Sequence, residues 1–237
     1  MSERERQKRA AAERAVTFVQ SGMRLGLGTG STAKHVLDVL GERLRDGTLR
    51  DVGGVPTSRA TADYARQLGI PVLDLDGAPR LDLAIDGADE VDPDLNLIKG
   101  LGGALLWEKI VESAAARFVV VVDESKLVTR LGEKAPVPVE VVPFGWRSLL
   151  PRFEAAGAQP ALRSGDDGAP FVTDGGHYIV DCRFPAGIAD SARTAALLRA
   201  PAGVVETGMF IDMASAVVIA GAAVRVLERN ASAAAYP

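Results

Sequence analysis

The sequence predicts an α/β fold, in which a Rossmann-like, mostly parallel sheet domain carries a smaller ferredoxin-like α+β domain inserted near the C-terminus. Two observations predict it. Over the first half of the chain, apolar strand-like runs alternate with helical patterns, which is typical of a parallel sheet covered by helices. After Lys126 the order becomes strand, helix, strands, helix and strand, which is the split βαβ pattern.

We expect the first domain to span residues 1–131 plus 210–237. Residues 118–122 form a nearly all-valine run, which suits a strand buried on both faces. Ser31 is expected to cap the helix after the first strand, and Gly69 to end the helix that starts at Ser58. The other expected elements are a helix at 10–20, strands at 24–27, 51–55, 72–75 and 81–85, a helix at 103–116, and a strand and helix within 214–229.

The second domain is expected at 132–209. Gly175-Gly176 predicts a hairpin turn between two of its strands. Its expected elements are strands at 137–142, 159–163, 171–174, 178–184 and 203–211, with helices at 147–156 and 190–198.

Composition narrows the function classes. The 237 residues carry a formal net charge of −4, which argues against a non-specific nucleic-acid binder. Residues 1–14 contain no apolar core of a signal peptide, and the apolar stretch at 214–226 is short for a membrane span. The single cysteine, Cys182, favours a reducing compartment, so we expect a cytoplasmic protein. His35, His177 and Cys182 show no metal-ligand spacing, so no metal is expected.

Two motifs follow predicted strands. In Gly26-Leu27-Gly28-Thr29-Gly30-Ser31-Thr32, glycines let the backbone approach an anion and a helix start presents N–H groups to it. The alternative is a tight structural turn. In Asp86-Gly87-Ala88-Asp89-Glu90, two crowded carboxylates indicate a site at the end of an apolar strand. The alternative is a solvated acidic turn, which is our expectation for Glu90 and its neighbours Asp92 and Asp94.

Two further motifs carry lysines. Lys99-Gly100-Leu101-Gly102-Gly103 precedes a helix and suits an anion or oxyanion site. Glu108 follows among apolar residues, which favour the raised carboxylate pKa of a general base. The alternative is a surface glutamate that pairs with Lys109. Lys126, at the end of the valine strand, either faces a cleft or is solvated.

We interpret His35 as a packing or surface residue, His177 as a solvated turn residue and Cys182 as an inert core residue.

Together these motifs resemble the family of ribose-5-phosphate isomerase type A. The resemblance rests on GLGTGSTA at 26–33, IDGADE at 85–90, KGLGGA at 99–104, EKI at 108–110 and DESK at 123–126, in that order, and on PVEV at 138–141, VTDGG at 172–176 and GVVETG at 203–208. It covers nearly the whole chain. This sequence departs from the family's pattern at two places. Leu101 stands where the family usually has glycine, and Leu106-Trp107 stands where the family has a more polar pair.

The resemblance implies a role for each motif. Glu108 would be the base that moves a proton between C1 and C2 of ribose 5-phosphate through a cis-enediol(ate). Asp86 and Asp89 would handle sugar hydroxyls and ring opening, and Lys99 would hold the developing oxyanion. The implied substrate-binding residues are Thr29, Gly30, Ser31, Thr32, Asp86, Gly87, Ala88, Asp89, Lys99, Gly100, Leu101, Gly102 and Lys126, with Lys8 as a further candidate near the phosphate.

The resemblance also implies a place in the non-oxidative pentose phosphate pathway. It implies a sugar phosphate as the small-molecule partner, no metal or organic cofactor, and assembly as a homodimer or homotetramer. Two alternatives remain open. One is another sugar-phosphate enzyme on this fold, a deaminase or lactonase, but those use histidines and neither His35 nor His177 lies in a motif. The other is a non-catalytic sugar-phosphate sensor of a transcriptional regulator, which would lack Glu108.

Overall fold

The computed structural model describes residues 2–229. Within them the chain forms two compact units, one of residues 2–88, 107–126 and 212–229, the other of residues 89–106 and 127–211. The second unit thus differs from the segment expected at 132–209, because it also takes in 127–131, 210–211 and the separate segment 89–106. The segment 89–106 joins this unit through a small antiparallel sheet, in which β5 (Leu97–Ile98) pairs with β4 (Glu90–Val91) and with β11 (Met209–Phe210). Residues 230–237 of the expected first domain lie outside the described residues.

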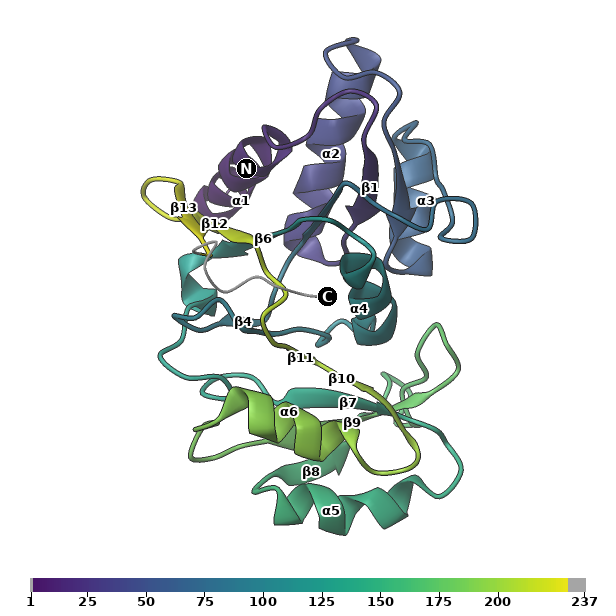
Figure 1. Ribbon diagram of the computed structural model, residues 1–237, viewed down its shortest axis with the longest axis vertical. Helices are drawn as coiled ribbons and strands as arrows, with labels where there is room; N and C mark the ends of the chain where they lie inside the picture. Colours follow the sequence, from purple (N-terminus) through teal and green to yellow (C-terminus); the bar gives the residue numbers. More distant parts are fainter. Residues whose placement is uncertain (1, 230–237) are drawn as a thin grey trace. The chain divides into compact units, whose positions relative to one another are not determined.

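The first unit contains a six-stranded sheet in the order β13-β12-β6-β3-β1-β2 (Figure 1). All neighbours are parallel except β12 and β13. The strands are β1 (Arg24–Leu27), β2 (Gly53–Pro56), β3 (Leu83–Asp86), β6 (Phe118–Asp123), β12 (Ala216–Ala220) and β13 (Arg225–Glu228). Every residue of β6 is buried, which confirms the strand predicted from the valine run. The mostly parallel sheet is confirmed as well.

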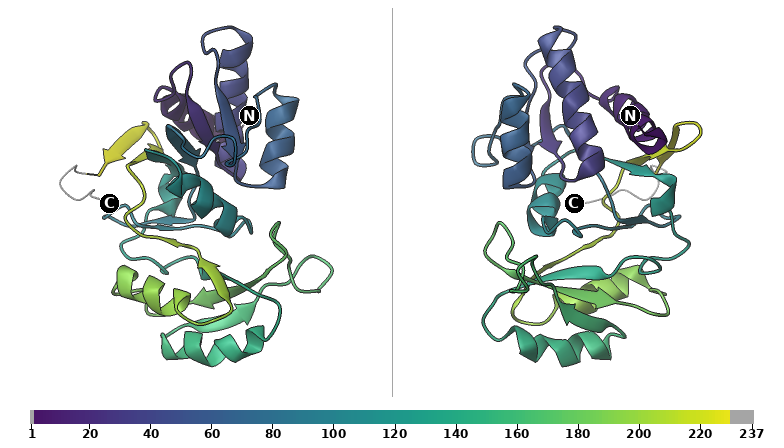
Figure 2. Two further views of the ribbon diagram at one scale, coloured as in Figure 1. Left: turned by 45° about the vertical axis from the view of Figure 1, so that its right-hand side comes forward. Right: turned by 180° about the vertical axis from the view of Figure 1, so that it is seen from behind.

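Helices cover both faces of this sheet. They are α1 (Glu3–Val16), α2 (Ser31–Arg45), α3 (Arg59–Gln67) and most of α4 (Leu105–Ser113). Leu25 and Leu27 pack into the core that α1 and α2 close, and α2 crosses in front of β1 when the unit is seen from behind (Figure 2, right). Because successive positions of a strand face opposite sides of the sheet, position 26 faces away from the core that contains Leu25 and Leu27. A Cβ on Gly26 would lie 2.8 Å from Val111 Cγ1, so α4 packs closely on that face.

Several expected elements of the first unit are wrong. No helix follows β12 within the described residues; β13 instead turns back and pairs with it, which satisfies the backbone groups along the edge of β12. Residues 72–75 form no strand, and only Val72 bridges to Gly54. The first helix begins at Glu3 rather than 10, because Ser2 accepts a hydrogen bond from Glu5 N and caps it. The helix expected at 103–116 is α4, which is shorter at both ends.

The second unit has a four-stranded antiparallel sheet in the order β10-β7-β9-β8. Its elements are β7 (Val137–Val141), the 3-10 turn η2 (Trp146–Leu149), α5 (Leu150–Ala155), β8 (Gln159–Leu162), β9 (Tyr178–Arg183), α6 (Ser191–Arg199) and β10 (Val204–Thr207). Alternate residues of β7 form one core with Phe153 of α5 and Leu198 of α6, so both helices cover the same face.

Two strands of this unit differ from expectation. Residues 171–174 make a single bridge, between Val172 and Tyr178, instead of a strand. The strand expected at 203–211 breaks into β10 and β11 at Gly208. A Cβ on Gly208 would lie 2.2 Å from the carbonyl oxygen of Lys99, so the chain changes sheets at a close backbone contact.

Candidate active site

The expected site residues are distributed over both units. The first unit contains the glycine turn, Asp86-Gly87-Ala88, Glu108 and Lys126, and the second contains Asp89 and Lys99-Gly100-Leu101-Gly102. In the first unit, β1, β3 and β6 run parallel, so the segments that follow them leave the same edge of the sheet.

Asp86 holds the glycine turn in place. Its Oδ1 accepts hydrogen bonds from Thr29 N at 2.9 Å and from Gly87 N at 2.6 Å. The turn approaches β3 so closely that a Cβ on Gly28 would lie 2.2 Å from Asp86 Oδ1. Asp86 is buried. The structure therefore brings Asp86 and Thr29 together and shows why glycine is required at 28.

The turn leads into α2 without a side-chain cap. Gly30, not Ser31 as expected, is the N-cap, with a φ of 102° that favours glycine. Because the first N–H groups of a helix have no intrahelical acceptor, this end of α2 suits an anion. Lys8 of α1 reaches the same place, since its Nζ lies 3.1 Å from Ser31 Oγ and 3.3 Å from Glu5 Oε1.

A cavity of about 260 Å³ opens beside the glycine turn. Lys34 Nζ lies 4.6 Å from the centre of the Tyr64 ring at this cavity, and the Tyr64 hydroxyl donates to Asp38. The lining residues are Gly28, Thr29, Gly30, Lys34, Leu37, Ala60, Thr61 and Tyr64. The sequence motifs included only the first three of these.

Glu108 lies on α4 and is only 5% exposed, which agrees with the apolar surroundings expected for it. The alternative of a surface glutamate is wrong. Glu112, one turn later on the same helix, is buried as well and was not among the expected site residues.

The segment after β6 is a 3-10 turn, η1 (Glu124–Lys126). Asp123 Oδ1 accepts a hydrogen bond from Ser125 N at 3.0 Å and fixes this turn. Lys126 is half-buried. Glu124 forms an ion pair with Arg225 at 3.0 Å, so it contributes to the sheet edge rather than to a site.

In the second unit, Asp89 and the lysine–glycine loop are in contact. Asp89 Oδ2 accepts a hydrogen bond from Leu101 N at 3.0 Å, while the Leu101 side chain is exposed. Lys99 is 2% exposed, with its Nζ 5.4 Å from the centre of the Phe210 ring. Arg163, which the motifs did not include, donates from Nη1 to the carbonyl oxygens of Gly100 and Leu101 at 3.0 Å each.

One glutamate and one histidine differ from what the sequence predicted. Glu90 is not a solvated turn residue; it is fully buried and accepts hydrogen bonds from the backbone of Gly132, Lys134 and Ala135 at 2.5 to 2.6 Å. His177 is not merely solvated either, because its Nδ1 lies 2.9 Å from Oε1 of the buried Glu140.

Cys182 is buried in β9, as expected for a core residue. Burial, followed by the charge of Asp181, raises its pKa to about 12. Within residues 2–229, no group of three or more His, Cys, Asp or Glu side chains is placed to hold a metal ion. Over the same residues, every helix is too short or too polar to cross a lipid bilayer.

Comparisons with known proteins agree with one another. A family model for ribose 5-phosphate isomerase A (phosphoriboisomerase A) matches residues 53–223. A ribose-5-phosphate isomerase A of Roseiflexus castenholzii is 58% identical over 214 residues, which cover 90% of this chain and 91% of that protein. A probable ribose-5-phosphate isomerase 2 of Arabidopsis thaliana is 55% identical over 220 residues, 90% of this chain and 83% of that protein.

Solved structures give the same result. A D-ribose-5-phosphate isomerase in complex with phospho-erythronic acid superposes with a TM-score of 0.92 at 43% identity, covering 95% of this chain and 99% of that one. The ribose 5-phosphate isomerase A of Methanocaldococcus jannaschii gives 0.90 at 41% identity, covering 94% and 99%. From these matches over nearly its full length, the chain belongs to the ribose 5-phosphate isomerase A family.

Proposed function

We propose that this chain interconverts ribose 5-phosphate and ribulose 5-phosphate through a cis-enediol(ate), with Glu108 as the general base. The observation that carries the proposal is the burial of the Glu108 side chain on α4, directly after a lysine–glycine loop, in a chain of this family. An aldose–ketose shift needs one base beside two adjacent carbons and shelter from water. A buried carboxylate suits both needs.

We assign the remaining roles residue by residue. The segment Thr29–Thr32 and Lys126 would hold the phosphate, aided by Lys8, so that binding energy at a remote group orients the reacting end. Asp86 and Asp89 would handle the sugar hydroxyls and ring opening. Lys99 would stabilise the oxyanion that develops at the carbonyl. The complex of a similar enzyme with phospho-erythronic acid supports a small phosphorylated ligand.

The test is ketose formation from ribose 5-phosphate in EDTA, for the native chain, Glu108→Gln and Glu112→Gln. Glu112→Gln is the matched control because it removes the other buried carboxylate of α4. We expect activity in the native chain and a loss of about 10³-fold or more in Glu108→Gln, of the order seen when a positioned base is removed. The control should lose far less.

Other outcomes would redirect the proposal. Tight binding of ribose 5-phosphate without turnover in any variant would indicate a sensor. Equal activity in Glu108→Gln and the native chain would remove Glu108 from its role and turn attention to Asp86 and Asp89. Activity that disappears in EDTA and returns with a metal ion would contradict the cofactor-free mechanism that we propose.

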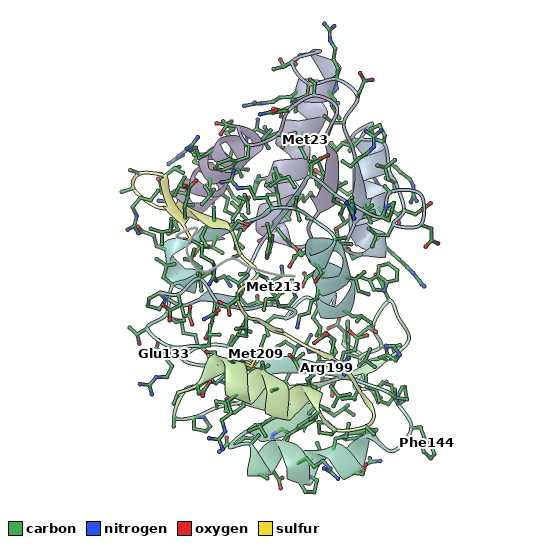
Figure 3. The ribbon with its side chains drawn as sticks, in the orientation of Figure 1. Met23, Glu133, Phe144, Arg199, Met209 and Met213 are labelled. Carbon is green, nitrogen blue, oxygen red and sulfur yellow. The ribbon has the colours of Figure 1, made fainter. Side chains whose placement is uncertain are left out.

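We also propose the finer features that the sequence pattern and the resemblance predicted. A ferredoxin-like second domain is supported by the strand order β10-β7-β9-β8 with both helices on one face. A cytoplasmic location is supported by the single, buried, free cysteine, Cys182. A place in the non-oxidative pentose phosphate pathway is supported by the family to which the chain belongs. Assembly as a homodimer or homotetramer is supported by Phe144, which is 93% exposed and projects from the second unit (Figure 3).

A further inference from the structure

Four hydroxyl groups meet beneath the glycine turn of the first unit. Thr29 Oγ1 lies 2.7 Å from Thr57 Oγ1, 2.9 Å from Ser58 Oγ and 3.0 Å from Thr61 Oγ1. Thr57, Ser58 and Thr61 are all buried, and they lie at the junction between β2 and α3. Buried hydroxyls are costly unless they are hydrogen-bonded, so this hydroxyl cluster is a feature that the fold must stabilise.

The cluster is tied to the backbone of the turn. Thr57 Oγ1 donates to the carbonyl oxygen of Leu27 at 3.2 Å, and Thr61 Oγ1 donates to that of Gly28 at 3.1 Å. Ser58 Oγ donates to Thr61 Oγ1 at 3.0 Å and links the two. Each hydroxyl carries only one proton, fewer than these contacts require in total, so the hydroxyls share their protons among several acceptors around the turn.

An ordinary helix cap accounts for only part of this arrangement. Ser58 is the N-cap of α3 and accepts a hydrogen bond from Thr61 N at 3.1 Å. That role explains Ser58 alone. It does not explain why the hydroxyls of Thr57 and Thr61 bond to carbonyl groups at the end of β1, a different strand.

We infer that Thr57, Ser58 and Thr61 are positioning residues that fix the Gly28-Thr29-Gly30 turn at the start of α2. Thr29 Oγ1 contacts the hydroxyl cluster and Thr29 N donates to Asp86 Oδ1, so both the side chain and the backbone of this residue are held. The inference rests on the proposed function for its substrate.

Thr61→Val and Thr61→Ser in the full chain test it, because valine keeps the shape of threonine and serine keeps the hydroxyl. We expect Thr61→Val to raise the Kd of inorganic phosphate and the KM for ribose 5-phosphate by about 5- to 10-fold, the effect of losing roughly one hydrogen bond. The kcat should stay within about twofold, because the reacting end is untouched. Thr61→Ser should restore both constants.

Thr173→Val is the matched control, since Thr173 is a buried threonine of the second unit whose hydroxyl donates to Glu140 Oε1 at 2.8 Å. It should lower the Tm without changing phosphate affinity. If Thr61→Val does not fold, Ser58→Ala removes one member of the same network and should raise both constants in the same direction. An unchanged phosphate Kd in a folded Thr61→Val or Ser58→Ala variant would overturn the inference.

Phosphate affinity separates this inference from the proposed function. If the native chain binds phosphate, and Thr61→Val weakens that binding, the positioning role stands even when no isomerase activity is found. If the native chain is an active isomerase and phosphate affinity does not change in the variants, the function stands and the positioning role is wrong.

Discussion

At the scale of single residues, Asp86 combines a structural and a proposed chemical role, and the two can be separated. Its Oδ1 accepts from Thr29 N and Gly87 N. Asp86→Asn keeps an oxygen that can accept these bonds, whereas Asp86→Ala removes it. We expect Asp86→Ala to lower the free energy of unfolding by about 2–3 kcal/mol, since buried donors lose their acceptor, and Asp86→Asn by about 1 kcal/mol or less.

Activity should follow a different order. Both variants lose the carboxylate that we assign to the sugar hydroxyls. Both should therefore lose at least about tenfold in kcat/KM, which corresponds to the loss of one or more hydrogen bonds to a charged group. Urea unfolding and ketose formation measure the two effects. Full activity in Asp86→Asn would restrict Asp86 to its structural role.

Glu90 provides a second test, this time of stability alone. It is fully buried and accepts three backbone hydrogen bonds from residues 132–135. Glu90→Ala would leave these donors without an acceptor, so we expect a loss of at least about 3 kcal/mol in urea unfolding. Asp94→Ala, at an exposed neighbouring acid, is the control and should change stability by less than about 0.5 kcal/mol. Equal effects would contradict this reading of Glu90.

The thiol of Cys182 is expected to be unreactive in the folded chain. Its pKa is raised by burial from 9.0 to about 12. Because the folded pKa is higher, the contribution of Cys182 to stability is complete below about pH 9 and is lost as pH rises from there toward 12. At pH 8 a disulfide reagent should react with Cys182 only after guanidine unfolding. Rapid reaction in native buffer would show that β9 opens readily.

At the scale of elements, the contact between α4 and β1 depends on the absence of a side chain at Gly26. A Cβ there would lie 2.8 Å from both Ala84 Cβ and Val111 Cγ1. Gly26→Ala should therefore displace α4, the helix of Glu108, and cost about 1–3 kcal/mol of stability as overpacking. Gly77→Ala is the control, since a Cβ at 77 meets only Asp74 Oδ1, at 3.3 Å. Differential scanning calorimetry of both variants measures the difference.

Elements with a strong local pattern could be predicted from the sequence. The strand at 24–27 is β1 itself, and the valine run is β6 with one further residue, because consecutive apolar residues suit a doubly covered parallel sheet. The hairpin strand β13 and the break at Gly208 could not be predicted, since both depend on partners that are remote in the sequence. β13 alternates little in burial, and Gly208 is fixed by the carbonyl group of Lys99.

The same distinction holds for the candidate site. The glycine turn and the helix with Glu108 have local signals, namely closely spaced glycines and a carboxylate among apolar residues. Thr57 and Arg163 do not, because they contact Thr29 and Gly100, which lie 28 and 63 residues away. One signal was available for the hydroxyl cluster: Thr57-Ser58 follows β2, at the sheet edge where the glycine turn follows β1.

At the scale of the whole molecule, an acidic chain is proposed to bind an anionic substrate. The formal net charge is −4, so the net charge of the chain does not favour the approach of a phosphate. Local attraction must suffice. The start of α2, with Lys8 beside Ser31, concentrates positive potential at one place on an otherwise acidic protein.

The proposed self-association is a prediction for the whole molecule. Among residues 2–229, Phe144 is the most exposed large apolar side chain, and burying a phenylalanine contributes about 1.5–3 kcal/mol. In a symmetric dimer each copy would bury one such ring, so Phe144→Ser should weaken association by at least about 10²-fold if the ring lies in the interface. Light scattering after size exclusion should give a multiple of 24.8 kDa for the native chain and a smaller mass for the variant at low concentration. Arg152→Ser, at another exposed position of this unit, should keep the native mass. A monomeric native chain would contradict the assembly, and an assembly that Phe144→Ser leaves intact would place the interface elsewhere.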